Sequence, residues 1–102
     1  MSVDRTGWTD FERAVANVLD GLGPGDLVTY GEVAAEAGFP GAARAVGSML
    51  GRRTEADFPW WRVVAANGRL LVGHEDQQRQ LLNQEGVTVR DGRIGTARHD
   101  GR

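Results

Sequence analysis

The sequence predicts a single domain that is mainly α-helical and carries one small β-hairpin. Three observations predict this fold class: two capping boxes that each open an apolar stripe at helical spacing, a short turn between two helices, and an Asn-Gly pair between two apolar runs. The length of 102 residues suits one domain. We expect the domain to occupy residues 1–90 and residues 91–102 to form a flexible tail.

The first helix is predicted to begin after Thr9. Thr9 and Glu12 form a capping box, in which the hydroxyl and the carboxylate accept hydrogen bonds from backbone N–H groups that the start of a helix leaves unpaired. The apolar residues that follow recur at the spacing of one buried helix face: Phe11, Ala14, Val15, Val18, Leu19 and Leu22. Gly21, Gly23 and Pro24 are expected to end the helix.

Two shorter helices are predicted next, joined by a tight turn at residues 39–41. Thr29 and Glu32 repeat the capping box and open a helix that Gly38 ends. A third helix is predicted over residues 42–50, with Gly51 as its end. Its expected inward residues are Ala45, Val46 and Met49. Two short helices joined by such a turn indicate a helix-turn-helix.

A β-hairpin is predicted after this unit. Residues 61–64 and 69–72 are apolar runs that flank Asn67-Gly68, the strongest short-range hairpin signal. A fourth helix is expected over residues 75–85, and residues 87–89 can add a strand. A hairpin that follows a helix-turn-helix is the wing of a winged helix-turn-helix.

The composition excludes several kinds of chemistry. The sequence has no cysteine, which rules out disulfides, cysteine-bound zinc, iron–sulfur clusters and thiolate catalysis. Its two histidines, His74 and His99, make a histidine-based metal site improbable. We therefore expect no metal and no cofactor.

The net charge of −2 is unevenly distributed. Residues 1–40 carry two arginines and seven acids, whereas residues 41–72 carry five arginines and two acids. Such local clustering of positive charge is a typical footprint of nucleic-acid binding. No apolar run approaches the roughly 20 residues of a membrane helix, and no signal peptide is recognisable. We expect a cytoplasmic monomer.

Three segments resemble a known family. They are Thr29-Tyr30-Gly31-Glu32-Val33-Ala34, Ala42-Ala43-Arg44-Ala45-Val46-Gly47 and Pro59-Trp60-Trp61-Arg62-Val63. They resemble the DNA-binding domain of the O6-alkylguanine-DNA alkyltransferases and, more closely, the alkyltransferase-like proteins, which lack the alkyl-accepting cysteine. In this resemblance Trp60 stands at the acceptor position, Trp61 replaces the family's histidine, and Glu85 matches its glutamate.

The resemblance implies roles for individual residues. Arg44 matches the arginine that replaces an extruded nucleotide in the base stack, and Tyr30 matches the tyrosine that helps rotate that nucleotide outward. The implied DNA-binding residues are Tyr30, Ala42, Ala43, Arg44, Gly47, Ser48, Arg52, Arg53, Ala66 and Asn67. The implied pocket for the damaged base is lined by Tyr30, Trp60, Val63, Gly73 and His74. Arg69 is a further candidate phosphate contact, whereas Arg62 and Glu85 are expected to be structural, with Glu85 pairing with Arg62 or capping backbone amides.

The implied function is recognition of damage without catalysis. Such a protein binds O6-alkylguanine in duplex DNA through the minor groove, flips the nucleotide, and flags it for nucleotide excision repair proteins. Without a cysteine the alkyl group cannot be transferred to a thiolate, and the indole nitrogen is not a nucleophile at neutral pH. Two alternatives remain open. One is a winged-helix DNA-binding module without lesion specificity, and the other is a protein-interaction domain whose pocket Trp60 and Trp61 have filled.

Overall fold

The structure is a computed structural model that describes residues 5–54 and 56–94. Its helices are α1 (Asp10–Asp20), α2 (Tyr30–Glu36), α3 (Ala43–Arg52), the 3₁₀ helix η1 (Trp60–Arg62) and α4 (Glu75–Gln84). Its strands are β1 (Val28–Thr29), β2 (Val63–Val64), β3 (Val89–Arg90) and β4 (Arg93–Ile94). None of the helices in these two ranges is long and apolar enough to cross a bilayer.

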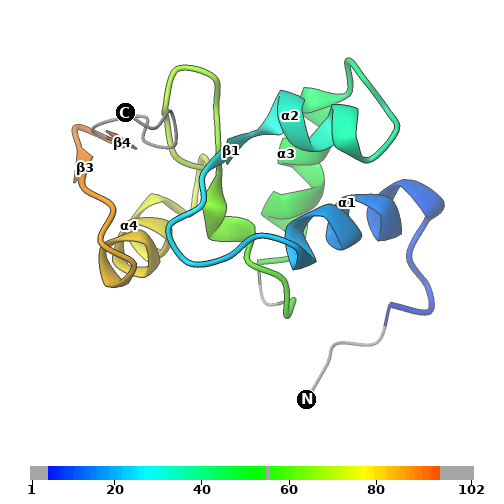
Figure 1. Ribbon diagram of the computed structural model, residues 1–102, viewed down its shortest axis with the longest axis horizontal. Coiled ribbons are helices and arrows are strands. Elements are labelled where there is room, and N and C mark those ends of the chain that lie inside the picture. The colour runs from blue at the N-terminus through cyan, green and yellow to red at the C-terminus, as the bar shows by residue number, and fades with distance from the viewer. Residues whose placement is uncertain (1–4, 55, 95–102) are drawn as a thin grey trace.

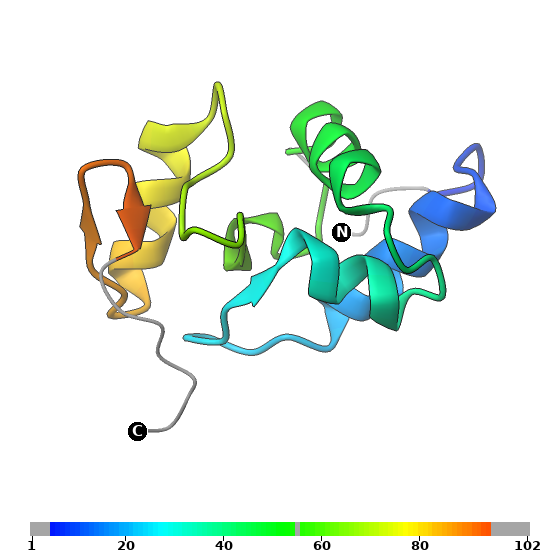
Figure 2. The ribbon, with the colours of Figure 1, turned by 90° about the horizontal axis from the view of Figure 1, so that it is seen from above.

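The helices and strands form two groups along the molecule. Figure 1 shows α1, α2 and α3 on one side, and α4 with β3 and β4 on the other. The view from above shows η1 between the two groups (Figure 2). This arrangement confirms a mainly α-helical domain with small strand pairs.

Both predicted capping boxes are present. The Thr9 hydroxyl accepts a hydrogen bond from the backbone N–H of Glu12, and the Glu12 carboxylate accepts one from Thr9. Thr29 and Glu32 make the same reciprocal pair at the start of α2. Because a capping box depends only on residues three apart, these two helix starts follow directly from the local sequence.

The main core lies between the first three helices and η1. Its buried side chains include Val15 and Leu19 of α1, Val33 of α2, Val46, Met49 and Leu50 of α3, and Trp60 of η1. A second cluster packs beneath α4 and the β3–β4 hairpin, and its buried members are Leu27, Val64, Leu70 and Leu82. Ala45, which was expected to face the core, is exposed on α3.

The strands differ from the predicted wing. Asn67-Gly68 does form a tight turn, in which the backbone N–H of Gly68 donates to Ala65, but residues 61–64 and 69–72 do not pair as two strands. Instead β2 pairs in parallel with β1, with Val28 opposite Val63. The antiparallel pair is β3 with β4, and Arg69 makes a single bridge to Arg93.

Two predicted boundaries also change. Helix α3 continues through Gly51 to Arg52. Residues 91–94, predicted as tail, belong to the β3–β4 hairpin, whose turn contains Asp91 and Gly92 with positive φ angles of 56° and 77°. Hydrogen bonds from the Leu70 N–H to the Gly92 carbonyl and from the Ile94 N–H to the Gly68 carbonyl hold this segment against the rest of the domain. The rest of the predicted tail, residues 95–102, lies outside the described residues.

Candidate nucleic-acid interface

A hollow of about 640 Å³ lies between α3 and the segment that precedes α4. One wall comes from the start of α2 and from α3, through Tyr30, Ala43, Arg44, Gly47, Ser48 and Gly51. The opposite wall comes from the loops and the hairpin, through Ala65, Asn67, Arg69, Leu70, Leu71, Val72, Glu75 and Gly92. The structure thus brings together six of the ten predicted DNA-binding residues, namely Tyr30, Ala43, Arg44, Gly47, Ser48 and Asn67.

The α3 side of the hollow is lined mainly by short side chains, and we call this face the shallow wall of α3. Gly47 faces the ring of Tyr30, and a Cβ atom built at Gly47 would lie 3.9 Å from that ring. Ala43 and Ser48 continue the same wall. A helix face without long side chains allows close approach of a second surface along α3.

Tyr30 is half-buried at the first position of α2. Burial raises the pKa of Tyr30 to about 12. Its phenol therefore stays neutral near pH 7 and keeps its proton as a hydrogen-bond donor.

Arg44 is exposed on the first turn of α3, at the edge of the hollow. Across residues 5–54 and 56–94 it makes no ion pair and no hydrogen bond through its side chain. Its guanidinium is therefore free to bind another molecule.

Arg52 and Arg53, predicted as phosphate contacts, both pair with Glu12 of α1. Nη2 of Arg52 lies 3.4 Å and Nη2 of Arg53 lies 3.2 Å from Glu12 Oε2. The Arg53 guanidinium also stacks over Trp8, 4.3 Å from the ring centroid. The hydrogen bond from Thr9, together with those from Arg53 and Arg52, lowers the pKa of Glu12 against the opposing effect of burial. These contacts fix the end of α3 against α1.

Trp60 and Val63 do not line the hollow. The side chain of Trp60 is 2% exposed, and Val63 is buried in the same core. The Trp60 ring makes edge contacts with the rings of Trp61 and His74, at centroid distances of 6.2 Å and 6.1 Å. Trp60 on η1 and Val63 on β2 therefore both pack into the core, and their predicted place in the pocket for the damaged base stays a prediction.

Gly73 and His74 lie in the turn before α4, next to the hollow but not on its wall. Gly73 has a φ of +89°, and its backbone N–H donates to the Glu75 carboxylate. His74 is half-buried against Trp60. Their neighbours Val72 and Glu75 are the residues that reach the hollow.

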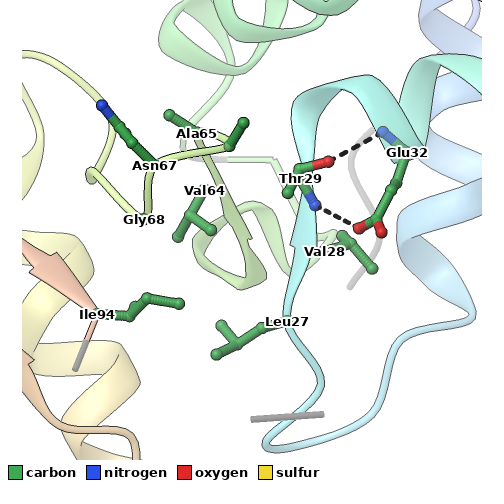
Figure 3. A pocket seen from close by; sticks show the side chains of 10 residues that line it. Leu27, Val28, Thr29, Glu32, Val64, Ala65, Asn67, Gly68 and Ile94 are labelled. Atoms are coloured by element: carbon green, nitrogen blue, oxygen red, sulfur yellow. Dashed lines mark hydrogen bonds between the residues drawn. The ribbon is translucent and has the colours of Figure 1, made fainter. Parts of the chain in front are cut away.

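Two further predicted DNA-binding residues, Ala42 and Ala66, do not line this hollow either. Ala42 is half-buried at the N-cap of α3. Ala66 is exposed and lines a neighbouring hollow of about 260 Å³, shown in Figure 3. That hollow is bounded by the Thr29–Glu32 capping box on one side and by Ile94 of β4 on the other.

Arg62 and Glu85 form a buried structural pair, as predicted. Nη2 of Arg62 donates to Glu85 Oε2 at 2.7 Å, and Nη1 of Arg62 donates to the Leu22 carbonyl at 2.8 Å. Glu85 also accepts hydrogen bonds from the Trp61 indole at 2.8 Å and from the Gly25 backbone at 2.9 Å. Glu85 therefore both pairs with Arg62 and caps a backbone amide.

Several residues that line the hollow had no site role predicted from the sequence, namely Gly51, Leu70, Leu71, Val72, Glu75 and Gly92. Val72 is 85% exposed at its edge, and Gly92 reaches it from the turn of the β3–β4 hairpin. The sequence assigned Val72 to a strand and Gly92 to a tail. No local pattern indicated that the hairpin would fold back beside residues 69–72.

The helix-turn-helix with its shallow-walled hollow defines a class of DNA-binding domain. Residues 10–87 match the family model of the 6-O-methylguanine DNA methyltransferase DNA-binding domain. The chain belongs to this family, and its lack of cysteine places it among the alkyltransferase-like proteins.

Relatives and solved structures agree with this placement. The chain is 43% identical over 75 residues to a DNA base-flipping protein of Vibrio parahaemolyticus, covering 71% of this chain and 75% of that one. It is 42% identical over 82 residues to the DNA base-flipping protein of Escherichia coli, covering 78% of this chain and 64% of the relative. The S. pombe Atl1 structure, in complex with damaged DNA containing O6-carboxymethylguanine, superposes with a TM-score of 0.72 at 30% identity. That match covers 79% of this chain and 80% of Atl1.

Proposed function

We propose that this chain binds duplex DNA containing O6-alkylguanine and rotates the damaged nucleotide into the hollow beside α3, without removing the alkyl group. The observation that carries the proposal is the exposed Arg44, which has no ion-pair partner among the described residues, at the edge of a hollow that also contains Tyr30. The names of the base-flipping relatives and the Atl1 complex with damaged DNA support it.

The shallow wall of α3 suits the DNA minor groove. That groove is only about 6 Å wide, so a helix can approach its floor only where its side chains are short. Ala43, Gly47 and Ser48 provide such a face along α3. Ala66 and Asn67, on the loop opposite, can place backbone amides against phosphate in the manner of a wing.

The guanidinium of Arg44 fills the gap that the flipped nucleotide leaves in the base stack. A planar guanidinium can stack on the neighbouring bases while it donates hydrogen bonds to the orphaned partner base. Tyr30 acts on the rotated nucleotide. Because its phenol is neutral, it can approach a phosphate without charge repulsion and donate a hydrogen bond to it.

The alkyl group stays on the base. The chain has no cysteine, and the indole of Trp60, at the position matched to the family's acceptor, is not a nucleophile. Trp60 is buried beneath His74, so a flipped base can stack on it only after the turn that carries His74 moves. Base–aromatic stacking on Trp60 would then contribute about 1–3 kcal/mol.

We further propose that the complex serves as a marker. A bound protein that neither repairs nor releases the lesion presents a persistent distorted site, which nucleotide excision repair proteins can recognise. The chain would do this as a cytoplasmic monomer.

The test is a binding titration with two matched duplexes, one containing O6-methylguanine and one guanine at the same position. We expect the damaged duplex to bind at least about tenfold more tightly, because a modified guanine that pairs poorly costs less to extrude. Intact-mass measurement after incubation should show a protein of unchanged mass.

Three outcomes would contradict the proposal. Equal affinity for both duplexes would favour a winged-helix module without lesion specificity. Binding to neither would favour a protein-interaction domain whose site is closed by the two tryptophans. A protein that gains the mass of a methyl group would overturn the non-catalytic assignment.

A further inference from the structure

The β3–β4 hairpin is fixed to the loop that borders the α3 hollow. The backbone N–H of Ile94 donates to the Gly68 carbonyl at 2.9 Å, and that of Leu70 donates to the Gly92 carbonyl at 3.1 Å. Between these two bonds, Arg69 bridges Arg93 in antiparallel fashion. The hairpin therefore extends the loop at residues 68–70 into a small three-stranded arrangement.

Apolar contacts hold the hairpin in place. Val89 and Ile94 pack on the cluster that contains Leu27, Val64 and Leu82. In Figure 3, Ile94 points toward Val64 and Leu27. Because both strands are anchored in this way, the side chains that they present outward have defined positions.

Those outward positions carry a row of three arginines. Arg93 lies opposite Arg90 in the hairpin and is bridged to Arg69 on its other side. Residues directly opposite on paired strands share one face, and like charges there destabilise a sheet. The three side chains surround a hollow of about 440 Å³, whose other lining residues are Asp91 and Ile94. One carboxylate does not balance three guanidiniums.

The arginines that the structure describes divide into two groups. Across residues 5–54 and 56–94, six of them make ion pairs with acids: Arg5, Arg13, Arg52, Arg53, Arg62 and Arg79. Within those same ranges Arg44, Arg69, Arg90 and Arg93 make none. Arg69 lines both the α3 hollow and the hairpin hollow, so these four unpaired arginines follow one continuous surface.

We propose that Arg69, Arg90 and Arg93 form a second DNA contact, which binds the phosphate backbone beside the damaged site. This inference rests on the proposed function, because it assigns the hairpin a place on the same duplex. Guanidiniums bind phosphate through paired, charge-assisted hydrogen bonds, and such contacts position a protein without reading sequence. The hairpin follows residue 87, where the match to the family model ends, so it adds a contact beyond the matched domain.

The test compares the wild type with the double variant Arg90→Ala/Arg93→Ala in titrations over a range of salt concentrations. Arg79→Ala is the matched control, because Arg79 is exposed on α4 and already paired with Asp76. Loss of two phosphate contacts should make the slope of log K against log salt less steep by about 1.8. Affinity at low salt should fall by the same factor for damaged and undamaged duplexes, leaving their ratio unchanged.

The outcomes separate this proposal from the proposed function. An unchanged slope with intact preference for the lesion would overturn the hairpin contact alone. A shallower slope without any lesion preference in the wild type would support the hairpin contact while base flipping fails. Removing like charges should not unfold the hairpin, and thermal unfolding checks this; Arg90→Gln/Arg93→Gln repeats the test with longer side chains. A fall in affinity confined to the damaged duplex would contradict a contact that reads only phosphate.

Discussion

Replacing Arg44 with alanine is expected to weaken binding to the O6-methylguanine duplex by about 10- to 100-fold, with much less effect on the undamaged duplex. Arg44 has no partner to lose across residues 5–54 and 56–94, so its removal should leave the folded domain unchanged. The loss should fall on the step in which the damaged nucleotide leaves the stack, since Arg44 lies at the edge of the hollow. Titration of both duplexes at one fixed salt concentration measures it.

Two further variants sharpen this result. Arg44→Lys keeps the positive charge but lacks the planar guanidinium, so it should recover phosphate attraction and little of the lesion preference. Arg79→Ala removes another exposed arginine, which is paired with Asp76, and it should bind both duplexes like the wild type. If Arg44→Ala lowered affinity for both duplexes equally, Arg44 would be only a phosphate contact.

Replacing Glu85 with glutamine is expected to lower the free energy of unfolding at pH 7 by about 3–5 kcal/mol. The substitution leaves the buried guanidinium of Arg62 without a counter-ion and turns one carboxylate oxygen into an NH₂ group, which then faces either the Trp61 indole N–H or the Gly25 backbone N–H. Arg62 also holds the Leu22 carbonyl, so the change loosens the junction between η1, α4 and the end of α1. Urea unfolding followed by circular dichroism measures the difference.

The Glu85 carboxylate should also make the free energy of unfolding depend on pH. Burial raises the pKa of Glu85, but hydrogen bonds from Arg62, Gly25 and Trp61 lower it by more, so the folded-state pKa lies below the ordinary value. A lowered pKa stabilises the fold above the unfolded-state value of about 4.3, and this contribution is lost as the pH falls through the folded-state pKa.

The stability difference between wild type and Glu85→Gln should therefore shrink between pH 7 and pH 3. Glu36→Gln is the control, because Glu36 is exposed on α2 and makes no ion pair or side-chain hydrogen bond within the described ranges. It should unfold like the wild type at both pH values. A Glu85 variant as stable as the wild type at pH 7 would show that the buried pair does not hold the junction.

Helix starts and the helix-turn-helix could be predicted from sequence because their signals are local. Thr9 with Glu12 and Thr29 with Glu32 satisfy backbone groups within one turn, so no distant contact decides them. The end of α3 was predicted at Gly51, but the helix continues through that residue to Arg52. Arg52, one residue beyond Gly51, donates to Ser48 and pairs with Glu12, a contact with another helix that the local sequence does not reveal.

The wing and the pocket could not be predicted to the same extent. The partner of β2 is β1, 35 positions earlier in the chain, and nothing in residues 61–72 reveals it. That parallel pairing draws η1 into the core and buries Trp60. Of the residues predicted to line the pocket, only Tyr30 lines the hollow, with the predicted DNA contact Arg44 at its edge. The far wall of the hollow depends on the hairpin folding back onto residues 68–70.

Fluorescence of a base analogue tests the central claim of nucleotide flipping most directly. A 2-aminopurine placed next to O6-methylguanine emits weakly while it is stacked and more strongly when its neighbour leaves the helix. The flipping account predicts that saturating protein raises this emission in the damaged duplex and leaves it unchanged in the matched undamaged duplex. Saturated binding to the damaged duplex with unchanged emission would show that the protein recognises the lesion while it remains stacked, and would contradict the account.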